Sequence, residues 1–268
     1  MPFNLPRVTL LTSLGLCLIG SGCSSTPRLT SASPTAIVSP RQVHDVATHE
    51  ASSTSTETTT ESSTSTKFVA LTFDDGPYGT STREILDILK EKSVHATFFL
   101  LGKNSQEFPD EPLREVTEGH EIGNHSFDHS MQLPSMTAAQ FSANLDQAET
   151  AIATSTGIHP TLFRPPYGAL STTMRQVLKT KGYSIALWNV DPTDWNYVSS
   201  TSVQVVQRIL SAVKPNSVIL LHDGRDTQIN APRDNTVNAL PTLIDDLRAQ
   251  GYEFLTISEL REQIRKQP

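Results

Sequence analysis

The chain has 268 residues and a formal net charge of −7, because 28 Asp and Glu outnumber 21 Lys and Arg. This length suits one sizeable domain, and the acidic balance without any basic run argues against nucleic acid as a partner. Only two cysteines are present, Cys17 and Cys23, so the body of the chain has neither a disulfide nor thiolate chemistry.

Residues 1–22 have the pattern of an export signal. Arg7 gives a weak positive start, and the apolar stretch VTLLTSLGLCLIG that follows is short for a bilayer-spanning helix. Small residues before Cys23 resemble a bacterial lipoprotein cleavage site, although Gly20 stands where that motif usually has an aliphatic residue. Ordinary cleavage and an uncleaved short anchor are the alternatives. All three predict an exported protein: a lipoprotein of the cell membrane, or a protein of the cell wall, the periplasm or the medium.

Residues 23–66 are predicted to form a disordered linker. The stretch ASSTSTETTTESSTSTK consists almost entirely of Ser and Thr, and it has too little apolar surface to offset the entropy cost of folding. We therefore expect a monomeric folded head over residues 67–260 and a short tail over 261–268. The only expected membrane contact is the N-terminal anchor.

From Lys67 onward, strand patterns alternate with helix patterns. Strands are expected at KFVALTF, HATFFLLG, HEIGNH, LFRPPYG, YSIALWNV, SVILLHD and YEFLTI. Helices are expected over residues 81–93, 112–118, 137–157, 171–182, 203–213, 236–250 and 258–266. About seven β-α units in succession predict an α/β fold, either a parallel (β/α) barrel or a doubly wound sheet.

Polar side chains gather at or just after the C-terminal ends of five predicted strands. They are Asp74 and Asp75, His125 and His129, Arg164 and Tyr167, Asp191 and Asp194, and His222 and Asp223. In parallel barrels this rim carries the active site, which is built from several loops. The placement therefore favours a barrel, distorted or incomplete, over the doubly wound sheet.

His125 and His129 are candidate metal ligands. They lie four residues apart in HSFDH, so both imidazoles can face one ion if the stretch forms a helix or a single turn. Asp74 or Asp75 could add a carboxylate oxygen, which gives a set of ligands that leaves the metal open to water or substrate. The alternative is a surface pair of histidines. Non-haem iron oxygenases use the same ligand set, so the ligands alone leave the reaction open.

The other polar residues favour a hydrolase, which needs a base for its water and an acid for its leaving group. The aspartate that does not bind the metal can be the base. His222 can be the acid, because imidazole exchanges protons near neutral pH. Arg164 is too basic to transfer protons and can instead orient a carboxylate. Taken singly, Arg164 could equally form a structural ion pair and His222 could be a structural histidine, but an oxygenase needs no such acid–base set.

Five motifs, TFDDGP, HSFDH, RPPY, DPTDW and LLHD, occur in this order between about Lys67 and Leu260. Together they resemble the motifs of the polysaccharide deacetylases, the carbohydrate esterases of family four, also called the NodB homology domain. The resemblance implies a distorted (β/α) barrel and the metal-dependent removal of acetyl groups, mostly from N-acetylglucosamine polymers. Zinc is the expected metal, and cobalt, nickel or manganese could substitute.

The resemblance also implies roles for residues at matching positions. Asp74 would be the catalytic base, and Arg164 would hold it. Asp75, His125 and His129 would be the metal ligands. Side chains of adjacent residues at a strand end point in different directions, so the two aspartates can serve different purposes.

The later motifs would supply the rest of the site. Asp194 would hold the arginine that holds the base, and His222 would protonate the departing amine. The backbone N–H of Tyr167 would help to form an oxyanion hole. Leu220 and Trp195 would line the acetyl pocket and the sugar groove.

An exported head on a tether, without a separate carbohydrate-binding module, favours the cell's own peptidoglycan as the N-acetylated polysaccharide substrate. Chitooligosaccharides and acetylated xylan are the alternatives. A non-enzyme alternative is an exported carbohydrate-binding or wall-tethering head. The set of Asp74, Arg164 and His222 argues against it, because a binding protein needs no residues for proton transfer.

Overall fold

The computed structural model describes residues 66–196, 198–225 and 233–266. The predicted export signal, Cys23 and almost all of the predicted linker lie outside the described residues. Within the described part of the chain, no helix has the length and apolar character needed to cross a bilayer.

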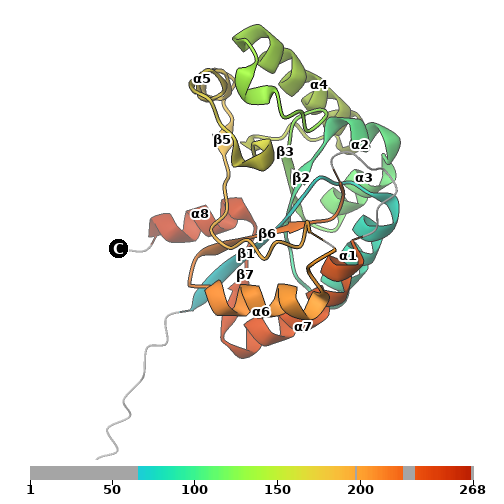
Figure 1. Ribbon diagram of the computed structural model, residues 1–268, viewed down its shortest axis with the longest axis vertical. Helices are drawn as coiled ribbons and strands as arrows, with labels where there is room; N and C mark the ends of the chain where they lie inside the picture. The colour runs from blue at the N-terminus through green and yellow to red at the C-terminus, as the bar shows by residue number, and fades with distance from the viewer. Residues whose placement is uncertain (1–65, 197, 226–232, 267–268) are drawn as a thin grey trace, which may run out of the picture. The chain divides into compact units, whose positions relative to one another are not determined.

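Seven parallel strands form one curled sheet in the order β5-β4-β3-β2-β1-β6, and β7 pairs with the start of β1 (Figure 1). The strands are β1 (Lys67–Asp74), β2 (Thr97–Leu100), β3 (Glu121–Asn124), β4 (Leu162–Phe163), β5 (Ser184–Ile185), β6 (Ser217–His222) and β7 (Tyr252–Phe254). Beyond the short β5, an isolated parallel bridge joins Val190 to Ile219 of β6. The fold is therefore the predicted distorted barrel, and the doubly wound alternative is wrong.

In the described residues, eight α-helices accompany the strands. They are α1 (Gly79–Glu91), α2 (Gly102–Glu107), α3 (Asp110–Thr117), α4 (Ala138–Thr156), α5 (Thr172–Thr180), α6 (Ser202–Ala212), α7 (Asp234–Ala249) and α8 (Ile257–Lys266). Capping boxes begin α4 at Thr137 and α6 at Thr201, and Gly157 ends α4 in the left-handed conformation. The sequence did not predict α2, because its residues GKNSQE carry no apolar face.

The two faces of β1 explain where the core and the polar site lie. Leu71 and Phe73 point to the outer face, where they join one core cluster with side chains of α1, α6 and α7. Ala70 points to the inner face, in a second cluster with Phe99 of β2. Because side chains alternate along a strand, the chain beyond Ala70 brings Thr72 and then Asp74 to the inner face. The last inner-face position of β1 is thus polar and lies at the C-terminal rim.

Helix α8 covers the inner face of the sheet near the N-terminal ends of the strands. Ile257 and Leu260 pack into the inner cluster, and the backbone N–H of Ile257 donates to Thr97 Oγ1 at the start of β2 (3.0 Å). On the far side, Arg261 Nη2 donates to the carbonyl of Ile185 in β5 (2.6 Å). The apolar side of α8 therefore fills the barrel from this end, while the polar residues occupy the opposite rim.

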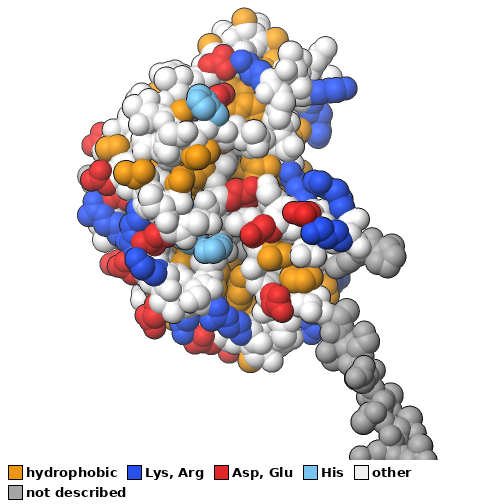
Figure 2. All heavy atoms as spheres, turned by 180° about the vertical axis from the view of Figure 1, so that it is seen from behind, with side chains coloured by type: hydrophobic (Ala, Val, Ile, Leu, Met, Phe, Trp, Pro, Cys, Tyr) orange, Lys and Arg blue, Asp and Glu red, His pale blue; other side chains and the backbone are white. Residues whose placement is uncertain are grey.

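The surface of the folded part carries charges of both signs. On the face drawn in Figure 2, Lys and Arg side chains lie among Asp and Glu side chains. This face therefore presents a field of mixed sign rather than one basic surface.

Candidate active site

The C-terminal ends of β1, β3 and β6 bring the predicted metal and acid–base residues together. Asp74 ends β1 and lies opposite His222, the last residue of β6, in the parallel register. His125 directly follows β3, and its backbone N–H donates to the carbonyl of Leu100 at the end of β2 (2.9 Å). The register thus places residues from three distant parts of the sequence at one rim.

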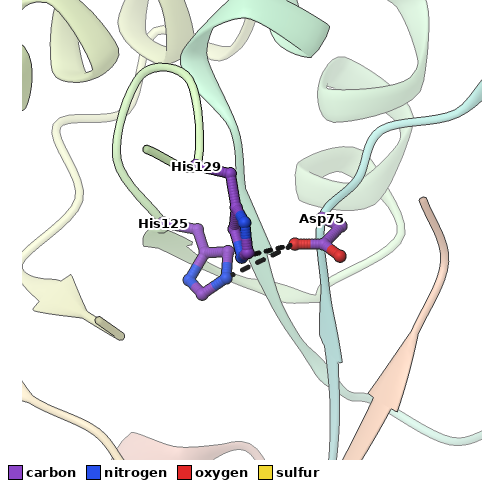
Figure 3. Close-up of side chains that lie close together, drawn as sticks. All are labelled: Asp75, His125 and His129. Atoms are coloured by element: carbon purple, nitrogen blue, oxygen red, sulfur yellow. Dashed lines mark ion pairs between the residues drawn. The ribbon is translucent and has the colours of Figure 1, made fainter. Parts of the chain in front are cut away.

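Asp75, His125 and His129 form a buried cluster that can hold a metal ion (Figure 3). Asp75 Oδ1 lies 3.5 Å from His125 Nε2 and 3.3 Å from His129 Nε2. These distances are long for hydrogen bonds, and Asp75 Oδ1 accepts no hydrogen bond although it is buried. A buried carboxylate oxygen that accepts no hydrogen bond and faces two imidazole nitrogens fits a bound cation. Two histidines and one carboxylate are also a ligand set of catalytic zinc.

The charge state of Asp75 suits a metal ligand. Burial on its own would raise the pKa of the Asp75 carboxyl, but the imidazoles of His125, His222 and His129 lower this pKa below its usual range. The carboxylate is therefore ionised at neutral pH. Its backbone has a φ of 72°, in the left-handed region, so the chain turns sharply after Asp74 and sends the two adjacent carboxylates in different directions.

The two histidines converge through a bent loop, not through the helix or single turn that the sequence suggested. Ser126 and His129 both have positive φ, 80° and 54°. Asn124 Oδ1 accepts the backbone N–H of Ser126 (2.8 Å), and Ser126 Oγ accepts that of His129 (3.1 Å). His125 Nδ1 donates to the carbonyl of Arg164 (2.8 Å), which leaves Nε2 of the same ring for a metal.

Arg164 holds the second aspartate of the pair. Its guanidinium is completely buried and rests on the ring of Phe99, 4.1 Å from the ring centroid. Arg164 Nη1 donates to Asp74 Oδ1 (2.8 Å) and to Thr72 Oγ1 (2.7 Å), and Nε donates to the carbonyl of Ala186 (3.2 Å). Asp74 Oδ2 lies 3.7 Å from His125 Nε2. One oxygen of Asp74 is thus bound to the arginine, and the other faces the metal-ligand cluster.

Asp194 does not hold Arg164, so the predicted contact between them is wrong. Asp194 Oδ1 accepts from His222 Nδ1 (2.8 Å), and Oδ2 accepts from the backbone N–H of His222 (2.8 Å) and from Thr236 Oγ1 (2.8 Å). The part of the loop after β5 that carries Asp194 therefore lies against the end of β6 and the start of α7. Tyr183, just before β5, packs against the ring of Phe163 of β4 in a separate core cluster.

The contact with the Asp194 carboxylate favours the protonated form of the His222 imidazole. Burial alone would lower the pKa of the imidazole, but the Asp194 carboxylate, helped by Asp75, raises it to about 9. The same ion pair lowers the pKa of Asp194, against the effect of its burial. At neutral pH His222 is therefore a positively charged proton donor whose Nδ1 is already engaged.

The remaining predicted residues lie around this centre. Tyr167 is 56% exposed, has a φ of 57°, and sets the edge of its ring against His129, with 4.5 Å between ring centroids. Trp195 is 49% exposed on the loop after β5. Leu220 is buried on β6, opposite Thr72 and on the same face as His222. Both aromatic side chains are thus about half exposed, and Leu220 lies one inner-face position before His222 on β6.

Asp223, which follows His222 in the sequence and could orient it, and Arg233 also lie near the cluster. Asp223 is buried and accepts from Thr82 Oγ1 (2.6 Å) instead of contacting the His222 ring. A Cβ added to Gly76 would lie 2.1 Å from Asp223 Oδ2, so only glycine fits between Asp75 and the turn at Pro77. Arg233 Nη2 lies 3.8 Å from Asp75 Oδ2. No motif marks Arg233 in the sequence, and only its spatial neighbours reveal it.

The chain is similar to known deacetylases. The family model described as "Polysaccharide deacetylase" matches residues 61–186. The peptidoglycan-N-acetylglucosamine deacetylase PgdA of Listeria monocytogenes is 38% identical over 194 residues, which make up 72% of this chain and 39% of that protein. A peptidoglycan-N-acetylglucosamine deacetylase of Bacillus cereus is 36% identical over 196 residues, or 72% of this chain and 88% of that protein.

A further relative has a solved structure. The peptidoglycan-N-acetylmuramic acid deacetylase PdaC of Bacillus subtilis is 36% identical over 201 residues, or 75% of this chain and 40% of that protein. The structure of PdaC matches with a TM-score of 0.67 and 34% identity, and the match covers 75% of this chain and 93% of the solved chain. This chain therefore spans about two fifths of the length of PgdA and PdaC.

Proposed function

This chain belongs to the polysaccharide deacetylase family, and we propose that it is a metal-dependent hydrolase that removes acetyl groups from N-acetylglucosamine residues of peptidoglycan. One observation carries the proposal. The cluster of Asp75, His125 and His129 lies beside a carboxylate held by an arginine and an imidazole held by a carboxylate. A hydrolase needs such a proton acceptor and donor, whereas a binding protein needs neither.

Asp75, His125 and His129 would hold the metal, which we propose to be zinc, with cobalt, nickel or manganese as substitutes. When bound, the metal supplies polarisation of the acetyl carbonyl and makes water more acidic. Asp74 would accept the proton of the attacking water at Oδ2, because its Oδ1 is occupied by Arg164. One oxygen of Asp74 thus binds Arg164, and the other would accept the proton.

His222 would give a proton to the leaving amine from Nε2, because Nδ1 is engaged by Asp194. The positive φ at Tyr167 turns the backbone of the 166–168 segment beside His129, and we assign the Tyr167 N–H to the oxyanion hole. Trp195 would pack against a sugar ring, and Leu220 would contact the acetyl methyl group. These assignments give Asp74 and His222 one proton each to transfer and the Tyr167 N–H one hydrogen bond to donate.

The names of the relatives support a cell-wall substrate. PgdA and the Bacillus cereus protein are named for N-acetylglucosamine, and PdaC is named for N-acetylmuramic acid. We propose N-acetylglucosamine for this chain and an exported location, as a lipoprotein anchored at Cys23 or as a protein of the cell wall. Chitooligosaccharides and acetylxylan are the alternative substrates.

Acetate release tests the function directly. The purified protein is incubated with peptidoglycan, chitin oligomers and acetylxylan, each with and without a chelator, and zinc is then added back. We expect release from peptidoglycan that the chelator abolishes and zinc restores. Release from chitin oligomers or xylan alone would identify the alternative substrates. No release from any polymer, together with retained binding, would establish the carbohydrate-binding head instead.

A further inference from the structure

Arg233 connects three separate parts of the rim. Its side chain is buried, with 3% of its surface exposed, immediately before α7. Nε donates to the carbonyl of Gly224 after β6 (2.6 Å), and Nη1 donates to the carbonyl of Trp195 in the loop after β5 (3.3 Å). Nη2 lies 3.8 Å from Asp75 Oδ2 after β1. One guanidinium therefore contacts the metal-ligand side and the substrate side of the candidate site.

The segment that carries Arg233 is itself fixed to its surroundings. The backbone N–H of Arg233 donates to Ser81 Oγ of α1 (2.9 Å). Asn235 Nδ2 donates to the carbonyl of Asp194 (2.7 Å), and Thr236 Oγ1 donates to its carboxylate (2.8 Å). The start of α7 thus holds the loop of Asp194 and Trp195 at several points, so Arg233 reaches Asp75 from a rigid support.

The two oxygens of Asp75 have different surroundings. Oδ1 faces the nitrogens of His125 and His129, and Oδ2 faces Arg233. An ion pair on Oδ2 restrains rotation of the carboxylate, so that Oδ1 points toward the imidazoles. The partners that orient a metal ligand affect both metal affinity and activity.

We propose that Arg233 is a positioning residue, which fixes the Asp75 carboxylate relative to the Trp195 loop. This inference rests on the proposed function for its catalytic consequence, but its effect on metal binding is measurable without substrate. Only the planar fork of an arginine reaches the three acceptors at once. A lysine ammonium keeps the charge but contacts through a single nitrogen.

The test compares Arg233→Gln and Arg233→Lys with Arg208→Gln as the matched control. Arg208 of α6 holds the same loop through the carbonyl of Pro192 (2.9 Å) and Ser200 Oγ (2.7 Å), and no contact with Asp75 is described for it. Zinc affinity is measured by calorimetry on each metal-free, full-length protein. Circular dichroism and the unfolding temperature establish that each variant is folded.

We expect both Arg233 variants to bind zinc about 10-fold to 100-fold more weakly and to lose kcat for acetate release by a similar factor. Arg208→Gln should bind zinc like the unchanged protein and should differ mainly in KM. Wild-type affinity or tighter binding in Arg233→Gln would overturn the proposal. So would a fully active Arg233→Lys, since charge alone would then suffice. If Arg233→Gln does not fold, Arg233→Lys decides the question, because it keeps a buried positive charge. An unchanged protein that binds zinc but releases no acetate would refute the proposed function while leaving the zinc comparison valid.

Discussion

Two buried ion pairs flank the metal-ligand cluster, and they face it in opposite ways. On the side of β1 and β4, the carboxylate of Asp74 faces the cluster and Arg164 lies behind it. On the side of β5 and β6, the imidazole of His222 lies beside Asp74 in the sheet register, and the carboxylate of Asp194 lies behind it. Each pair joins a carboxylate to a basic side chain. The carboxylate faces the cluster in the first pair, whereas the basic imidazole does so in the second pair.

The difference teaches how one kind of interaction can serve two chemical purposes. An arginine does not release its proton near neutral pH, so the first pair can only offer a carboxylate that accepts a proton. An imidazolium does release its proton, so the second pair offers a donor. Under the proposed mechanism, the side chain that faces the cluster decides whether a pair accepts or donates a proton. Breaking each pair in turn should therefore have a different effect on the reaction.

The largest effect is expected from Asp74→Asn, which removes the proton acceptor of the first pair. The kcat for acetate release should fall by about 10²-fold to 10⁴-fold, because no base then activates the water. Bound zinc should remain near one equivalent by elemental analysis, since Asp74 is not among the proposed ligands.

The adjacent substitution Asp75→Asn is the matched control for Asp74→Asn. It makes the same chemical change one residue later, but it should lower zinc content as well as activity, and excess zinc should restore part of the activity. If Asp74→Asn loses zinc and Asp75→Asn keeps it, the two roles are reversed. Equal loss of zinc in both variants would contradict any division of roles.

His222→Ala removes the proton donor of the second pair. The kcat on amide substrates should fall by roughly 10²-fold or more, with zinc content unchanged. Aryl acetate esters should suffer less, because an aryloxide leaves without prior protonation. The ratio of the two rate losses is the measurement, and equal losses would indicate a structural role for His222.

Asp194→Asn keeps the imidazole but removes the charge that holds its proton. The Asp194 carboxylate is the main group that raises the pKa of His222 to about 9 against the effect of burial, so removal of its charge lowers this pKa. The protonated form would then be lost at lower pH. The alkaline limb of kcat should therefore move to lower pH by about 1–3 units.

Thr236→Val is the control for that shift, because it removes one hydrogen bond to Asp194 and leaves the carboxylate charged. It should move the alkaline limb much less than Asp194→Asn does. An alkaline limb that stays in place in Asp194→Asn would show that His222 is not the titrating acid.

The smallest effect is expected outside both pairs, from removal of the predicted linker. A chain that begins near Lys67, where β1 starts, should keep its kcat on soluble oligosaccharides, because both pairs and the metal-ligand cluster lie beyond that point. Its activity on intact cell walls can fall, since the tether is then missing. A large loss on soluble substrates, or loss of folding, would contradict the prediction of a linker.

The sequence alone determined which residues reach the rim. Within the described residues, seven strand patterns and seven of the eight α-helices could be predicted, since the alternation along KFVALTF and the helical spacing of apolar residues depend on neighbouring residues. The same patterns placed Asp74 and His222 at strand ends. The helix α2 escaped prediction, because its short polar sequence carries no periodic signal.

Only the tertiary structure decided which of these residues touch each other. Asp74 and Arg164 are 90 positions apart, and Asp194 contacts Thr236 across 42 positions, so their pairing depends on how loops pass between strands. The sequence therefore supported the first pair but assigned Asp194 to the wrong cation, and it gave no sign of Arg233. The physical reason is that a strand pattern fixes where a side chain leaves the sheet, whereas a buried charge takes whichever partner the packed loops bring within hydrogen-bond distance.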